Sequence, residues 1–197
     1  YGEVTLYAKW ANEEDGVPYT YVVLEDGTVE ITGYTGSRRY ITVPEKIEGR
    51  TVSSIGDFAF AGHTRLREVT LPSSLTNIGQ GAFQNCANLI SVEIPANVTE
   101  IEDYAFDGDV RLSSVAFLGN SKLTTIGNYA FSRCASLKRI ELPASVQSVN
   151  GSAFYGAISL YNIAVQQGNS ALKSQDGVLF DLSGSTLVAF PAAWGSS

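Results

Sequence analysis

The sequence contains no methionine, a single histidine and two cysteines. Two cysteines cannot build a disulfide framework. No apolar run approaches the roughly 18 residues needed to cross a bilayer, and no basic-then-apolar leader opens the chain. We therefore predict no membrane insertion in this segment. Because the chain starts at Tyr1 without a methionine, we expect it to be an internal piece of a longer polypeptide.

Basic residues are also in the minority, with 13 Lys and Arg against 20 Asp and Glu and a net charge of -7. An acidic surface repels phosphate backbones, which argues against a nucleic-acid partner. Hydrophobic residues make up 44% of the 197 positions, which is enough for one folded body.

A short apolar pattern repeats five times along the chain. The dipeptide Ala-Phe recurs at steps of 23, 23, 25 and 23 residues, at Ala59-Phe60, Ala82-Phe83, Ala105-Phe106, Ala130-Phe131 and Ala153-Phe154. Two further apolar columns keep these steps: Ile55, Ile78, Ile101, Ile126 and Val149, and Leu66, Leu89, Leu112, Leu137 and Leu160. Columns locked to one period predict a solenoid, whose coils bury their apolar sides only by stacking.

Each coil is predicted to open with a strand, for which residues 66–72 are the model. Period-two alternation places Val69 and Leu71 inward and Glu68 and Thr70 outward, and the final proline ends the strand. A second short extended run follows in each coil, as in residues 75–78.

The Ala-Phe dipeptide is expected to lie on a single helical turn. Before it stands a turn column, made of Gly56, Gly79, Glu102, Gly127 and Asn150. Because Gly and Asn predominate there, we expect a positive φ at this column. Three residues directly after it are predicted N-caps of the helical turn: Asp57, Asp103 and Asn128.

The chain is expected to divide near residue 15. Residues 1–15 are interpreted as the terminal strand of a preceding repeat module plus an acidic linker, and residues 16–197 as the repeat domain. That domain is predicted to comprise an N-terminal capping hairpin over 17–36, coils over 40–168 and a closing hairpin over 169–191. The coil that begins at Leu112 lacks the proline and has two extra residues, which predicts an edge loop near Gly119.

The motif Ile-Gly-x-x-Ala-Phe at residues 78–83 and the motif Leu-x-x-Val/Ile-x-Leu-Pro at residues 137–143 recur in register. These motifs resemble the bacterial leucine-rich repeats of the BspA type, over residues 17–191. Residues 5–10 are similar to the last strand of the Listeria–Bacteroides surface repeat. The resemblance implies a right-handed β/α superhelix on a secreted or surface-anchored bacterial protein that adheres to host matrix proteins or other cells. It implies no catalytic residues.

Catalytic and metal-binding groups are sparse. His63 belongs to a column whose other members are Cys86, Asp109, Cys134 and Ala157, which argues against a general base or a dedicated metal site. No Gly-x-Ser-x-Gly elbow is present. Cys86 and Cys134 are two coils apart, roughly 9–10 Å at normal strand spacing, so we predict two free, buried thiols. We predict no enzymatic activity and no cofactor.

Carboxylates gather in one coil, at Glu93, Glu100, Glu102, Asp103, Asp107 and Asp109. The alternatives are a weak calcium site around Asp107 and a solvated acidic edge, and we expect the solvated edge. Tyr104 and Tyr129 share a column with Phe58. We expect them to pack between coils; the alternative is that they are exposed binding aromatics.

We interpret the chain as a monomeric, non-catalytic, extracellular interaction module that binds a protein or a cell-surface ligand on its stacked strands. The alternatives are a passive spacer within a larger surface protein and part of a secreted carbohydrate-active protein. The candidate ligand-binding residues are the outward strand positions: Glu68, Thr70, Ser91, Glu93, Ser114, Arg139, Glu141 and Asn162. The same two columns also contain Ala116 and Ala164.

Overall fold

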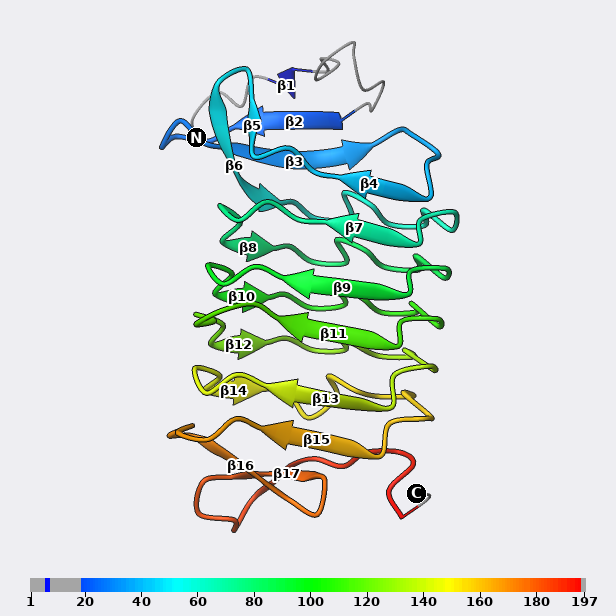
Figure 1. The fold of residues 1–197 in the computed structure, drawn as a ribbon, viewed down its shortest axis with the longest axis vertical. Helices are drawn as coiled ribbons and strands as arrows, with labels where there is room; N and C mark the ends of the chain where they lie inside the picture. The colour runs from blue at the N-terminus through cyan, green and yellow to red at the C-terminus, as the bar shows by residue number, and fades with distance from the viewer. Residues whose placement is uncertain (1–5, 8–18, 196–197) are drawn as a thin grey trace.

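The computed structural model describes residues 6–7 and 19–195. These residues form an elongated solenoid whose coils stack along one axis, with the N-terminal strands at one end and the C-terminal strands at the other (Figure 1). The predicted leucine-rich-repeat solenoid is confirmed, with one strand-bearing wall on each side of the core.

The two walls are built from different strands. One wall, termed the strand face, contains β4 (Tyr40–Thr42), β7 (Glu68–Thr70), β9 (Ser91–Ile94), β11 (Ser114–Phe117), β13 (Arg139–Leu142) and β15 (Asn162–Val165). The opposite wall contains β6 (Arg50–Ile55), β8 (Asn77–Ile78), β10 (Glu100–Ile101), β12 (Thr125–Ile126) and β14 (Ser148–Val149). Strands in the opposite wall pair in parallel, and their register places the predicted column from Ile55 to Val149 in line.

The core between the walls is a stack of phenylalanine rings. Phe60, Phe83, Phe106 and Phe131 stack with centroid distances of 5.0, 5.3 and 5.4 Å and interplanar angles of 8° or less. The ring of Phe154 continues the stack at 5.9 Å. The Ala, Ile and Leu columns are buried beside these rings, as the repeat predicts. Each ring is thus covered by the next coil, which is why no coil is stable alone.

The predicted helical turn is wrong, because the described residues contain no helix. Each Ala-Phe dipeptide lies instead on an arc of turns. Along this arc, successive N–H groups alternate between two kinds of acceptor. Ala105 N donates to Glu102 O in its own coil at 3.4 Å, whereas Phe106 N donates to Ala130 O in the next coil at 2.8 Å. A helix needs every N–H to bond within its own segment, so bonding between coils replaces it.

The expected positive φ at the Gly56, Gly79 and Gly127 column is also wrong. Glycine is required there by a close approach of the neighbouring coil: a Cβ on Gly127 would lie 2.7 Å from the backbone nitrogen of Asp103. Left-handed backbone occurs at two other columns of the arc, at Phe58, Gly81, Tyr104 and Tyr129, and at Gly62, Asn85, Gly108, Arg133 and Gly156.

The predicted N-caps have a different role. The Asp57 carboxylate accepts from the backbone N–H of Gln80 at 2.9 Å, and that of Asp103 accepts from the backbone N–H of Asn128 at 2.6 Å. Both acceptors therefore join one coil to the next. Because no helix follows them, these residues are not N-caps. Their carboxylates link neighbouring coils by hydrogen bonds.

The N-terminal end is closed by antiparallel strands. The hairpin expected over 17–36 corresponds to β2 (Tyr19–Val23) and β3 (Val29–Tyr34), and β3 joins the opposite wall through β6. β1 (Leu6–Tyr7) pairs with β2. The predicted linker and most of the predicted strand over 5–10 lie outside the described residues. A further hairpin, β5 (Lys46–Ile47) with β6, was not predicted.

At the C-terminal end, a three-stranded antiparallel sheet follows the last coil. It contains β16 (Leu172–Gln175), β17 (Val178–Asp181) and β18 (Leu187–Ala189). β17 and β18 correspond to the predicted closing hairpin, and β16 extends it. This sheet lies at the C-terminal end of the solenoid, next to β15 (Figure 1).

Candidate ligand-binding face

The strand face presents its outward side chains in the columns expected from the sequence. Glu68 pairs with Ser91, and Ser91 with Ser114. On the lower strands, Arg139 pairs with Asn162. Ser91 and Asn162 are half-buried, and the other six candidate residues are exposed. The alternation of Val, Ile and Leu with polar residues fixes this orientation, because the apolar set must face the core.

The face is not one continuous sheet. β4, β7, β9 and β11 form one parallel sheet, β13 and β15 form another, and β11 does not pair with β13. The break follows the coil with the two extra residues. Leu118 and Lys122 still donate backbone hydrogen bonds to Ile94 and Ala96 of the coil before, so the insertion protrudes as a loop around Gly119. The edge loop thus lies where the sequence predicts it.

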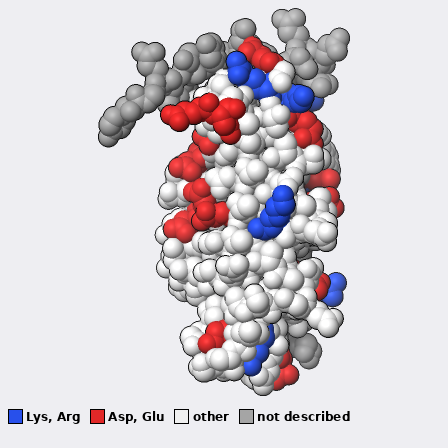
Figure 2. Space-filling view, turned by 90° about the vertical axis from the view of Figure 1, so that its left-hand side faces the viewer, with Lys and Arg blue, Asp and Glu red and all other residues white. Residues whose placement is uncertain are grey.

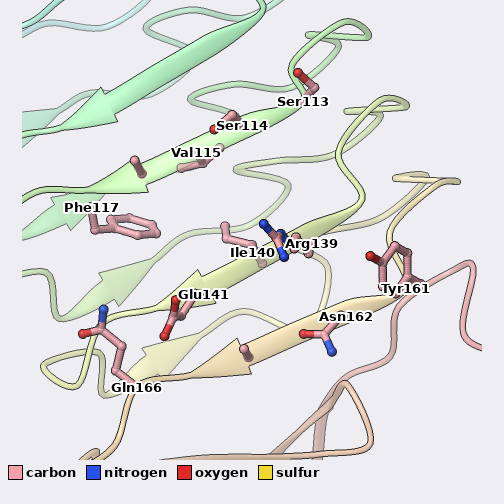
Figure 3. A pocket seen from close by; sticks show the side chains of 12 residues that line it. Ser113, Ser114, Val115, Phe117, Arg139, Ile140, Glu141, Tyr161, Asn162 and Gln166 are labelled. Carbon is pink, nitrogen blue, oxygen red and sulfur yellow. The ribbon is translucent and has the colours of Figure 1, made fainter. Parts of the chain in front are cut away.

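The break opens a groove of about 760 Å³ between the two sheets (Figure 3). β11 lies on one side and β13 and β15 on the other. Its lining includes four of the candidate residues, Ser114, Arg139, Glu141 and Asn162. The side chains of Tyr161 and Gln166 flank the two ends of the β15 side (Figure 3).

A second, smaller hollow of about 190 Å³ lies over the upper sheet. Five candidate residues line it: Glu68, Thr70, Ser91, Glu93 and Ser114. All eight predicted residues therefore border one of two hollows, and only Ser114 borders both. The structure brings them together as two groups rather than one.

Charges on the strand face are few and spaced. Glu68, Glu93 and Glu141 are exposed acidic groups, and Arg139 is the cation among the groove-lining residues. The view from the edge beside these strands shows carboxylates in rows along both sides of the molecule, with fewer basic groups between them (Figure 2). A partner for this surface has to tolerate negative charge.

The expectation of a solvated acidic edge is wrong for Asp107. This side chain is buried, and it accepts hydrogen bonds from Arg133 Nε at 2.9 Å and from Gln84 Nε2 at 3.0 Å. Burial by itself raises the pKa of Asp107, but the hydrogen bonds from Arg133, Gln84 and Ser132 outweigh it and leave the pKa lowered. Asp107 is a structural ion-pair partner.

Asp109 also departs from the solvated interpretation, because it is fully buried in the column of Cys86 and Cys134. Neither of its carboxylate oxygens has a hydrogen-bond partner among the described residues. Desolvation raises the pKa of Asp109 well above its ordinary value, and the nearby backbone N–H of Cys86 offsets only a smaller part of this effect. Glu100 remains exposed and Glu102 and Asp103 half-buried, so an acidic edge persists without the two aspartates.

The remaining candidate groups have structural surroundings. His63 is half-buried with its ring 5.0 Å from that of Tyr34, and desolvation lowers its pKa. The rings of Tyr104 and Tyr129 stack at 5.1 Å, which confirms packing between coils. In the described part of the chain, no three His, Cys, Asp or Glu side chains are arranged to hold a metal ion.

Sequence reasoning missed the groove itself, and with it Val115, Phe117 and Tyr161. A signal was present: the coil of Leu112 has two more residues than the regular coils beside it and lacks the proline after its strand. We read that irregularity only as an edge loop, whereas it also separates the strands that follow.

The repeat columns, the stacked rings and the paired walls have their counterpart in a known family. The model of the BspA type leucine rich repeat region matches residues 37–161 in six copies. The chain belongs to this family. A comparison with the curated proteins finds no match.

Solved structures have the same fold. A leucine-rich-repeat protein of T. pallidum is 34% identical over 74% of this chain and 67% of its own, with a TM-score of 0.70. The pneumococcal vaccine antigen PcpA is 23% identical over 95% of this chain, with a TM-score of 0.70, and this chain spans 56% of it. A leucine-rich cell surface protein of Faecalibacterium prausnitzii is 23% identical, with 96% and 62% covered and a TM-score of 0.55. The latter two support the fold alone.

Among the residues that the structure describes, no helix is long and apolar enough to span a membrane.

Proposed function

We propose that this repeat domain is a non-catalytic interaction module of a bacterial surface protein, and that it binds a protein partner on its strand face. The observation that carries the proposal is the hollowed strand face, with its 760 Å³ groove between β11 and β13. A wall that is only solvated is not expected to have such a recess. Protein partners bind best where a central recess is surrounded by a polar rim.

The extracellular location is part of the proposal. Its support is that two proteins with the same fold are a vaccine antigen and a cell surface protein. Solenoids of this kind offer an extended, ordered surface for contact with a partner. Because the core is filled by stacked rings, a partner would bind on the outside of the coils.

A passive spacer is the second candidate. It is favoured by β7 and β9, whose outward residues are acidic or hydroxyl-bearing and include no aromatic ring; on the upper sheet only β4 adds one, the exposed Tyr40. The groove favours binding instead, since Phe117 of β11 and Tyr161, next to β15, border it. We therefore centre the binding surface on the groove, which Glu141 borders, and extend it to the adjoining hollow, which Glu93 borders.

We also propose that residues 16–197 form the repeat domain and that residues 1–15 belong to a preceding repeat module with its linker. The pairing of β1 with β2 supports a continuous sheet between the two parts. The repeat domain is expected to act as a monomer.

The test uses charge reversal on the strand face. The wild-type domain and the Glu93→Lys/Glu141→Lys variant are compared for binding to surfaces that carry matrix proteins or bacterial cells. We expect the variant to lose at least tenfold in affinity, with an unchanged thermal midpoint, because exposed substitutions move stability by only about 0.5 kcal/mol.

The control is Glu100→Lys together with Ser148→Lys, which alters exposed positions on the opposite wall and raises the net charge by nearly as much. This control should bind like the wild type. Equal loss in both variants would indicate a general charge effect rather than a binding face. Absence of binding to every surface by the wild type would favour the spacer.

A further inference from the structure

The groove between β11 and β13 exposes part of the core. In the coil above, the inward residues Val92 and Ile94 are 2% and 0% exposed. Their counterparts on β11, Val115 and Phe117, are half-buried and line the groove. The unpaired strands leave these side chains uncovered. The floor of the groove is therefore apolar, and it also includes Ile140 of β13.

The rim of the groove carries two opposite charges. Arg139 and Glu141 are exposed on β13, and neither forms an ion pair with another described residue. They are two residues apart on one strand, which separates their Cα atoms by about 6.6 Å. Residues on either side of any one position in an extended peptide are the same distance apart. The rim thus matches the repeat of an extended polypeptide.

The walls of the groove are strand edges. β11 ends the upper parallel sheet and β13 begins the lower one, so each turns an unpaired edge toward the groove. Cα atoms of the two edges lie within 8 Å of each other, which leaves no room for a further strand between them, so a peptide would lie over the groove on its outer side. A glycan would instead be expected to use a broad, exposed ring surface. In the groove, Phe117 is half-buried among aliphatic side chains.

From these three features we infer that the groove binds an extended peptide segment of the protein partner. The segment inserts one large apolar side chain onto Val115, Phe117 and Ile140, and places an acidic residue near Arg139 and a basic residue near Glu141. A volume of about 760 Å³ accommodates such an anchor and its neighbours. This inference rests on the proposed protein-binding function and specifies the chemistry of the partner.

The probes are two acetylated and amidated seven-residue peptides that differ in one residue. Both carry Glu, a central residue and Lys in succession, flanked by Ser; the central residue is Phe in one and Ser in the other. Amide chemical shifts of the isotopically labelled domain report where each peptide binds and with what affinity. We expect the Phe peptide to bind at least tenfold more tightly and to shift residues of β11 and β13.

Two variants locate the binding. Ala164→Trp, on β15 beside the groove, fills the recess and should weaken the Phe peptide at least tenfold. Ser148→Trp adds the same ring to an exposed position on the opposite wall and should leave binding unchanged. Thermal unfolding of each variant verifies that it is folded. Should Ala164→Trp fail to fold, Arg139→Glu takes its place, because it alters only the rim.

Equal affinity for the two peptides, or shifts confined to other surfaces, would overturn the inference. So would binding of an oligosaccharide panel that Ala164→Trp abolishes while the peptides stay unbound, since the groove would then be a glycan site. The proposed function fails separately. If a macromolecular partner loses affinity for Glu93→Lys/Glu141→Lys but binds Ala164→Trp normally, the function stands and the peptide groove is wrong.

Discussion

Arg133 reaches back to the preceding coil and holds the carboxylate of Asp107, with its Nε donating at 2.9 Å. The side chain of Asp107 is 4% exposed and that of Arg133 is 56% exposed. Arg133 has a left-handed backbone with φ of 56°, in a column where three other coils have glycine. The ion pair therefore helps to stabilise Arg133 in a left-handed backbone conformation that favours glycine.

Replacing Arg133 separates the two effects. Arg133→Ala leaves Asp107 buried without its main donor and keeps the strained backbone, so we expect a loss of about 1–3 kcal/mol in unfolding free energy. Arg133→Gly loses the same pair but relieves the left-handed strain, and should be about 1 kcal/mol more stable than the alanine variant. Urea unfolding at pH 7 measures both. Equal stabilities would mean that the backbone at this position carries no strain.

The same pair gives an acid-sensitive contribution. The pKa of Asp107 is lowered in the folded state, so its stabilisation is present above the unfolded pKa, near 4, and is lost as the pH falls through the folded value. Unfolding free energies measured between pH 2 and 5 should therefore fall more steeply for the wild type than for Arg133→Gly. Parallel curves would contradict the role of the ion pair.

Asp109 has the opposite pH dependence. Its folded pKa is raised by burial, so the stability it confers is present below the unfolded pKa and is lost as the pH rises through the folded value. At neutral pH the buried carboxyl is a net cost. Asp109→Ala, which introduces the residue found at Ala157 of the same column, should raise the thermal midpoint at pH 7 and reduce its change between pH 4 and 7. A variant less stable than the wild type at pH 7 would indicate an unrecognised partner for this carboxyl.

The repeat columns in the sequence were sufficient to predict the stacking of coils and the outward positions of the strand face. Glu68 and Glu93 are exposed because alternation along a strand allows no other orientation once Val69 and Val92 face the core. The conformation of the Ala-Phe arc was not predictable in the same way. Its backbone N–H groups form hydrogen bonds with the next coil, and the sequence of a single coil does not reveal those acceptors.

The glycine column shows a related limit. Gly79 and Gly127 are recognisable as special, but sequence does not distinguish a requirement for positive φ from a requirement for close approach. The burial of Asp107 and Asp109 is equally hidden in the sequence, because both are charged residues in a turn. Asp107 is buried in an ion pair only because Arg133 lies beside it in the next coil. The groove depends on whether β11 and β13 pair, which the two-residue insertion affects without determining it.

The stacked rings predict a gradient of sensitivity along the solenoid. Phe106 has rings on both sides, at 5.3 and 5.4 Å, and is fully buried. Phe154 stacks only on Phe131, at 5.9 Å, and is 5% exposed. Phe106→Ala should cost about 3–5 kcal/mol, and Phe154→Ala distinctly less, because one fewer coil packs on the vacated space. Denaturant unfolding of the two variants gives the comparison. Similar costs at the two positions would mean that the end of the stack is as tightly covered as its centre.

Cys86 and Cys134 are free and buried, and each Sγ donates to a carbonyl of the preceding coil, Phe60 O at 3.0 Å and Phe106 O at 3.2 Å. Desolvation raises the pKa of both thiols, which disfavours the reactive thiolate. We expect neither thiol to react with a thiol reagent in the native protein and both to react after unfolding without reductant. His63→Cys is the matched comparison, because it places a third thiol in the same column at a half-buried position, where it should react with the folded protein. A disulfide between Cys86 and Cys134 already formed in the native protein would be incompatible with thiols two coils apart, and would overturn the register of the solenoid.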